Sequence, residues 1–269
     1  MQISRQSVYQ AVLRTESRRN ERAVIKEWVL YWRKFMPQLG TRKLYKLIKP
    51  KLIEHDIKLG RDGFFTYLKS EGLLVKAKKS FIKTTHSKHW MKKHPNLLKE
   101  EGLHNAEHVL VSDITYLESE QGVHYLSLVT DSDTRKIVGH HVSVDMKAEN
   151  VVKALKMAVK DKRYINNTVH HSDRGLQYCS AIYQDVLIAK GIRPSMTDGY
   201  DCYQNALAER INGILKQEFL IYRCKTLAEL KTLVAESIKI YNEMRPHLAL
   251  DMDTPNAVHN RKGQLLELA

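Results

Sequence analysis

Three carboxylates spread along the chain are the residues best suited to chemistry. Asp113 interrupts an apolar run at residues 109–117, Asp173 directly follows a short predicted strand, and Glu209 lies in a segment with helical spacing. Hard divalent cations prefer carboxylate oxygen as a ligand. Two such cations can activate a nucleophile and stabilise the leaving oxygen in phosphoryl transfer. The trio therefore predicts a metal-dependent phosphoryl-transfer site, provided that the fold brings the acids together.

Taken singly, each acid also has an ordinary structural role. Asp113 could face solvent from an edge strand, although apolar residues on both faces of that strand disfavour this. Asp173 stands in Ser-Asp-Arg-Gly, which is common turn chemistry. An isolated Glu209 fits a charged helix surface. Only the combination of the three favours a site.

The segment around Glu209 shifts the balance towards a site. At about 100° per residue, its polar side chains fall on one narrow helix face. These side chains are Asn205, Glu209, Asn212 and Lys216. Lys216 lies two turns beyond Glu209, about 10 Å along the helix. This predicts that Glu209 meets a metal and that Lys216 meets a phosphate, the alternative for Lys216 being a solvated surface charge.

Short motifs around and beyond the acids carry a family resemblance. They are Ser112–Tyr116, Tyr125–Asp131, Ile137–Gly139, His171–Tyr178, Asn205–Arg210, Leu215–Glu218, Tyr241-Asn242, Arg245–His247 and Thr254-Pro255. In order and spacing, over roughly residues 20 to 260, they resemble bacterial insertion-sequence transposases of the insertion sequence three family, which have a retroviral-integrase-like catalytic core. Leu176, Cys179 and Gln204 depart from the family pattern, but none is a presumed metal ligand.

The resemblance implies a DNA transposase that cleaves and joins strands at the ends of its element. Asp113, Asp173 and Glu209 would be catalytic and would hold two Mg²⁺ ions, with Mn²⁺ as a substitute. The implied partners are double-stranded DNA, as terminal repeats and as target, and at least one further protomer of this chain. In this family an upstream reading frame often supplies another DNA-binding and dimerisation segment, which could act as a partner protein, and we expect this chain to begin after it. A nuclease that cuts without joining and a non-catalytic DNA-binding regulator are the alternatives.

The order of predicted elements agrees with that family's fold. Strands are expected at residues 109–117, 122–131, 136–144, 168–171 and 191–194, with helices at 148–161, 180–190, around Glu209 and at 227–242. Three antiparallel strands followed by helix, strand, helix and strand is the order of a ribonuclease-H-like core. We therefore expect an α/β fold with a mixed five-stranded sheet flanked by helices, preceded by a helical helix-turn-helix module.

The positive charge of the chain is concentrated at its front. Residues 1–108 hold 24 of the 44 Lys and Arg but only 10 of the 30 Asp and Glu, which leaves residues 109–269 balanced. Such segregation favours a polyanion-binding module joined to a neutral catalytic one. The expected parts are a helix-turn-helix-like DNA-binding module at residues 1–75, a basic linker at 76–108, and the catalytic core with C-terminal helices at 109–269. The candidate DNA contacts are Arg61, Lys76, Lys78, Lys79, Lys83, Arg174, Asn205 and Lys216.

Helical spacing predicts the elements of the front module. The expected helices cover residues 3–10, 20–36, 41–50 and 64–70. Asn20 would cap the second of these, and Pro50 would bend or end the third. Trp28 is expected in the core rather than stacked on a base.

Composition excludes several other classes of protein. The three cysteines form no close pair and suit a reducing cytosol. No cysteine precedes Cys179, so His86, His89 and His94 lack the partners of a four-ligand set, and we expect no structural zinc. The apolar runs are too short for a membrane span, and no secretory signal opens the chain. We expect a cytoplasmic protein acting on bacterial DNA.

Overall fold

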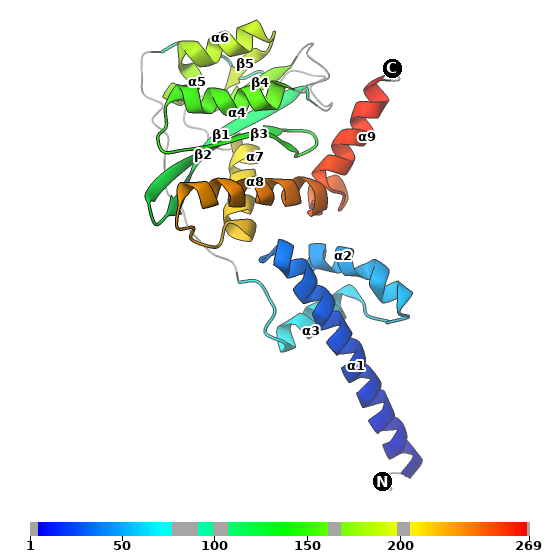
Figure 1. The fold of residues 1–269 in the computed structure, drawn as a ribbon. Helices are drawn as coiled ribbons and strands as arrows, with labels where there is room; N and C mark the ends of the chain where they lie inside the picture. Colours follow the sequence, from blue (N-terminus) through cyan, green and yellow to red (C-terminus); the bar gives the residue numbers. More distant parts are fainter. Residues whose placement is uncertain (1–4, 77–90, 99–106, 161–167, 198–204, 268–269) are drawn as a thin grey trace. The chain divides into compact units, whose positions relative to one another are not determined.

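The computed structural model describes residues 5–76, 91–98, 107–160, 168–197 and 205–267. The chain forms two compact units, Met1–Ala77 and Lys78–Ala269. The first unit is helical and the second is built around a sheet (Figure 1). Lys78, Lys79, Lys83, His86 and His89 lie outside the described residues.

Three helices make up the first unit. They are α1 (Arg5–Phe35), α2 (Thr41–Glu54) and α3 (Arg61–Ser70). Their apolar sides form its core, with Ile25, Trp28 and Val29 from α1, Leu44 and Ile48 from α2, and Phe64 and Leu68 from α3. Trp28 is thus buried in the core, as its spacing predicted. The Tyr67 hydroxyl donates to the Arg22 carbonyl oxygen at 2.8 Å and ties α3 to α1.

Asn20 does not begin a helix, and Pro50 does not end one, so these two expectations are wrong. α1 is continuous from Arg5, so Asn20 lies inside a helix, and residues 5–10 belong to that helix rather than to a separate one. The Arg and Glu residues around Asn20 are strong helix formers, which outweigh its preference for a helix start. α2 passes through Pro50 and ends at Glu54. Leu52, just after the proline, is buried, and this packing offsets the hydrogen bond that Pro50 cannot donate.

A mixed five-stranded sheet organises the second unit, as predicted. Its strands are β1 (Val109–Ser119), β2 (Gly122–Asp131), β3 (Ile137–Ser143), β4 (Val169–Ser172) and β5 (Arg193–Met196). The order across the sheet is β3-β2-β1-β4-β5. β1, β2 and β3 are antiparallel, whereas β4 pairs in parallel with both β1 and β5. β1 therefore lies at the centre, where its first residues, up to Val111, pair with β4 on one side and with β2 on the other.

Helices cover both faces of this sheet (Figure 1). They are α4 (Ala148–Lys160), α5 (Leu176–Cys179) and α6 (Ala181–Ala189) on one face, and α7 (Ala206–Ile214) and α8 (Leu227–Met244) on the other. Side chains alternate along β1: Leu110 packs in the core cluster with α4, while Val109 and Val111 pack with Ala208 of α7. By the same alternation, Asp113 faces α7.

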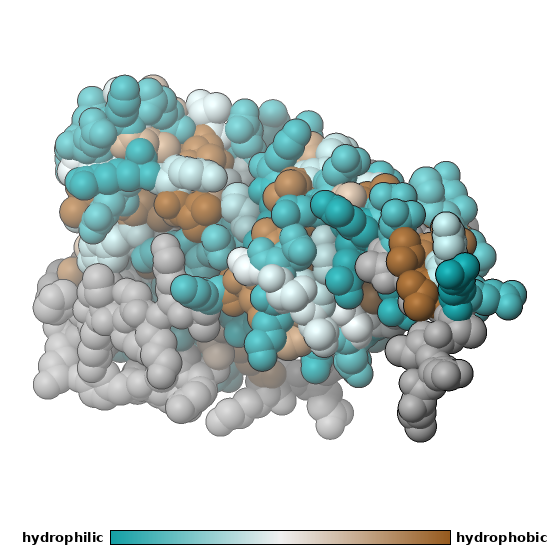
Figure 2. All heavy atoms as spheres, turned by 90° about the horizontal axis from the view of Figure 1, so that it is seen from below, coloured by the Kyte–Doolittle hydropathy of each residue, from teal (hydrophilic) through white to brown (hydrophobic). Residues whose placement is uncertain are grey.

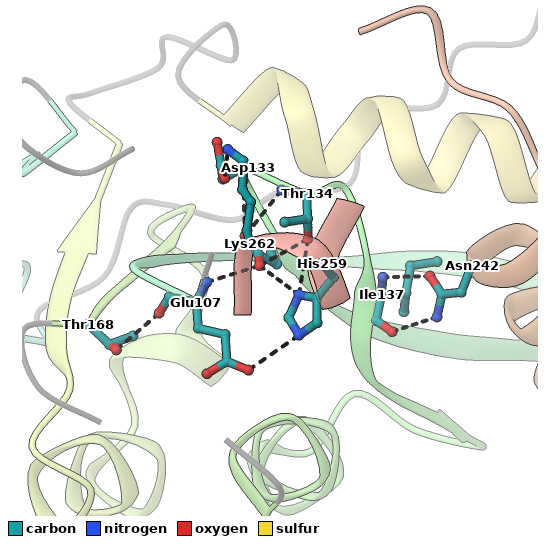
Figure 3. Close-up of polar contacts among 9 residues, drawn as sticks. Glu107, Asp133, Thr134, Ile137, Thr168, Asn242, His259 and Lys262 are labelled. Carbon is teal, nitrogen blue, oxygen red and sulfur yellow. Dashed lines mark hydrogen bonds and ion pairs between the residues drawn. The ribbon is translucent and has the colours of Figure 1, made fainter. Parts of the chain in front are cut away.

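The last helix, α9 (Pro255–Glu267), is held to the core by a polar network (Figure 3). His259 lies 3.2 Å from the Asp131 carboxylate through Nδ1 and 3.4 Å from Glu107 through Nε2. Although burial opposes charge on both groups, these contacts raise the pKa of His259, and hydrogen bonds from His259 and backbone N–H groups lower the pKa of Asp131. Lys262 adds an ion pair with Asp133. The C-terminal helix is therefore fixed by buried charge as well as by packing.

The described part of the surface is mostly polar. In the view of Figure 2 the described side chains are largely hydrophilic, with hydrophobic ones in small separate groups. Within the described ranges, no helix has the length and apolar character needed to cross a bilayer.

Replacing Gly139 by Ala should destabilise the second unit. A Cβ at this position of β3 would come within 2.1 Å of the Ala154 carbonyl oxygen on α4, so strand and helix must move apart. We expect a loss of about 3 kcal/mol in unfolding free energy, as for an overpacked core. The control is Gly213→Ala in α7, where an added Cβ meets nothing within 4 Å and should stabilise the helix by up to about 1 kcal/mol. Denaturant unfolding of both variants measures this, and equal midpoints would contradict the close β3–α4 contact.

Candidate active site

The parallel pairing of β1 with β4 brings two of the three acids to the same level of the sheet. The register pairs Val109 with Val169 and Val111 with His171. Asp113 and Asp173 each lie two residues beyond the last paired residues, and the repulsion of Asp113 by Asp173 agrees with a continuation of this register. Each carboxylate is oriented by the backbone: the Ile114 N–H donates to Asp113 at 2.9 Å, and the Gly175 N–H donates to Asp173 at 3.0 Å.

Helix α7 delivers the third acid to the same face. Asn212 donates from Nδ2 to the Asp113 carboxylate at 2.8 Å, and Asn205 donates from Nδ2 to the Ser112 carbonyl oxygen at 3.1 Å. Both asparagines are buried, and Glu209 lies between them in the sequence with its side chain exposed. The two amides therefore fix the helix against β1 on either side of Glu209.

The electrostatics agree with this placement of the three acids as near neighbours. Burial and then repulsion from Asp173 raise the pKa of Asp113 to about 7. Burial and repulsion from Asp173 also raise the pKa of Glu209 above its ordinary value. Groups that repel one another in this way favour either a bound proton or a bound cation.

The donor set fits a hard divalent cation. Asp173 lies near enough to Asp113 and Glu209 to raise the pKa of both, and the Oδ1 atoms of Asn205 and Asn212 are buried without a hydrogen-bond partner among the described residues. Within those residues, however, no three His, Cys, Asp or Glu side chains already stand close enough to enclose a metal. Asp113 is engaged by Asn212 and Ile114, and Glu209 is exposed. A cation would therefore draw the acids together from this arrangement.

Comparison with known proteins shows which family the sequence resembles. A family model described as "Integrase core domain" matches residues 104–202, and a second model of that description matches residues 190–255. The "Insertion element IS600 uncharacterized 31 kDa protein" of Shigella sonnei is 35% identical over 229 residues, covering 84% of this chain and 83% of that protein. The "Transposase InsF for insertion sequence IS3A" of Escherichia coli (strain K12) is 35% identical over 152 residues, covering 56% of this chain and 53% of that protein.

The chain belongs to the IS3 family of insertion-sequence transposases. Among solved structures, the simian T-cell lymphotropic virus intasome in complex with PP2A regulatory subunit B56 gamma contains a chain with a TM-score of 0.51 and 16% identity. The match covers 86% of this chain and 74% of that one. This likeness bears on the fold alone and agrees with the predicted ribonuclease-H-like, integrase-type core.

Lys216 of this transposase is not on a regular α-helix with Glu209. α7 ends at Ile214, and a π-helical turn, η2 (Leu215–Phe219), continues from it. A π turn inserts an extra residue, which changes the direction of every following side chain. Lys216 nevertheless reaches β1, where its Nζ lies 3.4 Å from the Thr115 Oγ1. Thr115 is two residues from Asp113 and on the same face of the strand, so Lys216 lies on the side of the sheet that carries the acids.

The other described candidates for DNA contact have different surroundings. Asn205 is buried against β1, and Arg174 is half-buried beside Asp173. Arg61 is exposed at the start of α3 and pairs with Asp62 at 3.3 Å, and Lys76 is also exposed. Their contacts with DNA stay predictions.

Sequence reasoning missed residues that support the site from within the core. Asn212 was placed on the face of Glu209, but its bond to Asp113 depends on how α7 packs. On the other face of β1, Ser112 and Tyr183 both hydrogen bond to His170 Nε2, at 2.7 and 2.8 Å. Burial lowers the pKa of His170 to about 3, so this histidine is neutral and structural. The polar residues next to each acid in the sequence were the signal that could have indicated these supporting hydrogen bonds.

Replacing Asp113 by Asn should stabilise the metal-free transposase at high pH. Because the folded-state pKa is about 7 against an ordinary 3.8, the carboxylate opposes folding as the pH rises from about 4, and the cost is complete above pH 7. It amounts to at most about 4 kcal/mol. Asn212 can turn its amide to pair with the new side chain. Thermal unfolding in a chelator should show a higher Tm than wild type at pH 8 and a smaller gain at pH 5.

The matched control for this measurement is Asp185→Asn, on the exposed side of α6. It should change Tm little at either pH. A gain for Asp113→Asn that is absent, or equal at both pH values, would contradict the proposed repulsion.

Proposed function

We propose that Asp113, Asp173 and Glu209 form the catalytic site with which this transposase cleaves DNA and joins strands at the ends of its insertion sequence. The observation that carries the proposal is that Asp113 and Glu209 both lie near enough to Asp173 for its charge to raise their pKa values. The β1–β4 register supports the nearness of Asp113 and Asp173, and the α7 asparagines support that of Glu209. The raised pKa of Asp113 is the electrostatic consequence.

Each residue of the proposed site has a different role. Asp113 within β1 and Asp173 just after β4 are held by backbone N–H groups, so they form the rigid part of a divalent-cation site for Mg²⁺ or Mn²⁺. Glu209 is exposed on α7 and closes the site by a side-chain rotation. The cations would supply activation of the attacking hydroxyl and stabilisation of the leaving oxygen. Asn212 keeps one Asp113 oxygen in place, as outer groups do around metal ligands.

The partner of this site is double-stranded DNA, as the terminal repeats of the element and as target. The excess of Lys and Arg in residues 1–108 supports the binding of DNA phosphates by this part of the chain, outside the neutral catalytic core. We further propose that at least two protomers act together on paired ends, and that the upstream-frame product of the element is a further partner. The structural relative is a chain of an intasome, which supports assembly in that protein.

Removing any one acid should abolish chemistry but not DNA binding. Asp113→Asn, Asp173→Asn and Glu209→Gln should each reduce cleavage and joining of labelled terminal-repeat DNA by at least about a thousandfold, because residues that act as a unit lose function together. Affinity in a gel-shift titration should change less than about threefold.

Asp185→Asn on α6 and Glu236→Gln on α8 provide matched controls. Both side chains are exposed, and each substitution replaces a carboxylate by the corresponding amide, as in the site variants. They should cleave and join at the wild-type rate. Normal joining by Glu209→Gln would remove that residue from the site and leave the proposal without its third ligand.

The basic residues of the linker should set the salt dependence of DNA binding. Replacing Lys78, Lys79 and Lys83 by Ala in the full chain should make the slope of log affinity against log salt shallower. The change should be roughly 0.9 for each phosphate that the variant no longer neutralises, for up to about three phosphates. A variant with the same charge change, Lys153, Lys156 and Lys160 to Ala on the exposed side of α4, is the control. Equal slopes for the two triple variants would show that general charge, rather than the linker, binds the DNA.

A further inference from the structure

An ion pair between buried Arg245 and partly buried Glu218 links the end of α8 to the π-helical turn that carries Lys216. Arg245 is 1% exposed and donates to both Glu218 oxygens, from Nε at 2.8 Å and from Nη2 at 2.7 Å. Its Nη1 donates to His247 Nε2 at 2.8 Å. The guanidinium also lies 5.7 Å from the centre of the Tyr241 ring. All the guanidinium nitrogens therefore have partners in one fixed geometry.

The Arg245 side of this pair is anchored to the edge of the sheet. Two residues near the end of α8 bind the backbone around β3. Asn242 accepts from the Ile137 N–H at 3.0 Å and donates to the Ile137 carbonyl oxygen at 2.9 Å (Figure 3). The Tyr241 hydroxyl donates to the Arg135 carbonyl oxygen at 3.0 Å. The end of α8 is thus a fixed support.

The Glu218 side of the pair belongs to an irregular element. The π-helical turn Leu215–Phe219 follows α7 directly, and the Leu220 N–H bonds to the Leu215 carbonyl oxygen at 2.8 Å. π-helical turns are rare, which favours a role for the tertiary contact with Arg245 in holding this one. Lys216, the second residue of the turn, extends to Thr115 of β1.

Stability alone is a poor explanation for this pair. Burying two charges costs much of the energy that their attraction returns, and apolar replacements are often neutral or stabilising. What a two-pronged contact does provide is one defined geometry between its partners. Here the partners are a fixed helix end and the turn that sets the direction of Lys216.

We propose that Glu218 and Arg245 are positioning residues that hold the π-helical turn, so that Lys216 lies over β1 beside Asp113 and meets the DNA strand next to the scissile phosphate. The inference rests on the proposed function, because it needs DNA at the three acids. Glu218 and Arg245 themselves touch neither DNA nor metal. The motif Tyr241-Asn242 with Arg245-Pro246-His247 thereby gains a role: it anchors the catalytic helix from outside the site.

The first test compares Glu218→Gln with the exposed control Glu236→Gln in the full-length protein. Glu218→Gln should lower the joining rate at saturating DNA by about ten- to a hundredfold while DNA affinity changes less than threefold. Hydrogen exchange of the Leu220 amide should accelerate, because its bond closes the π turn. Glu236→Gln should change neither. The second variant is Arg245→Lys, which keeps the charge but cannot make the two parallel hydrogen bonds to Glu218. It should behave as Glu218→Gln does.

A double-mutant cycle separates positioning of Lys216 from a general loss of stability. If Glu218 acts through Lys216, the variant carrying both Lys216→Ala and Glu218→Gln should join no more slowly than Lys216→Ala alone. Multiplying effects would overturn the proposal. So would normal joining by Glu218→Gln, or slow joining with unchanged exchange at Leu220.

These measurements distinguish a failure of the proposed catalytic site from a failure of the positioning role of Glu218 and Arg245. If Glu209→Gln joins strands normally, the proposed catalytic site fails. The exchange of the Leu220 amide in Glu218→Gln still reports whether the pair holds the turn, and unchanged exchange there overturns the positioning role by itself.

Discussion

The parallel pairing of β1 with β4 is the constraint on which the site depends. It sets Asp113 and Asp173 side by side at the middle of the sheet, where burial and mutual repulsion raise the pKa of Asp113 to about 7. A fold that only needed stability would separate these carboxylates or replace one of them. Their retention in the core of the sheet is understandable if a cation relieves the repulsion, because the electrostatic cost in the metal-free protein then becomes affinity for the metal.

Much of the surrounding structure serves to keep this unfavourable arrangement in place. On the α7 face, Asn205 and Asn212 bind β1 on either side of the position of Glu209. On the opposite face, Ser112, His170 and Tyr183 form buried hydrogen bonds directly behind Asp113. Packing alone tolerates small slips between elements, whereas buried hydrogen bonds do not, since a slip would leave polar groups unpaired.

The elements with strong local signals were predicted well. β2 was expected at residues 122–131 and occupies Gly122–Asp131, because turn residues delimit an apolar run at both ends. β5 was placed two residues too early, since its position is decided by pairing with β4 rather than by its own residues. α1 and α2 were predicted too short. The predictions relied on the local signals at Asn20 and Pro50, and the packing that extends both helices cannot be read from those signals. That the fold brings the three acids together stays a prediction from the order of elements, and the bond from Asn212 to Asp113 could not be predicted from that order.

The π-helical turn shows most clearly what a sequence pattern omits. A regular helix predicts Lys216 on the face of Glu209, and the side chain does reach the acid-bearing face of β1, but by another path. The turn is held by Arg245, which is 27 residues from Glu218 in the chain and fixed in turn by the contact of α8 with β3. No local propensity encodes such a dependence. The direction of a catalytic-site lysine is therefore decided at the far edge of the sheet, which explains why a short motif well beyond the three acids belongs to the same functional unit.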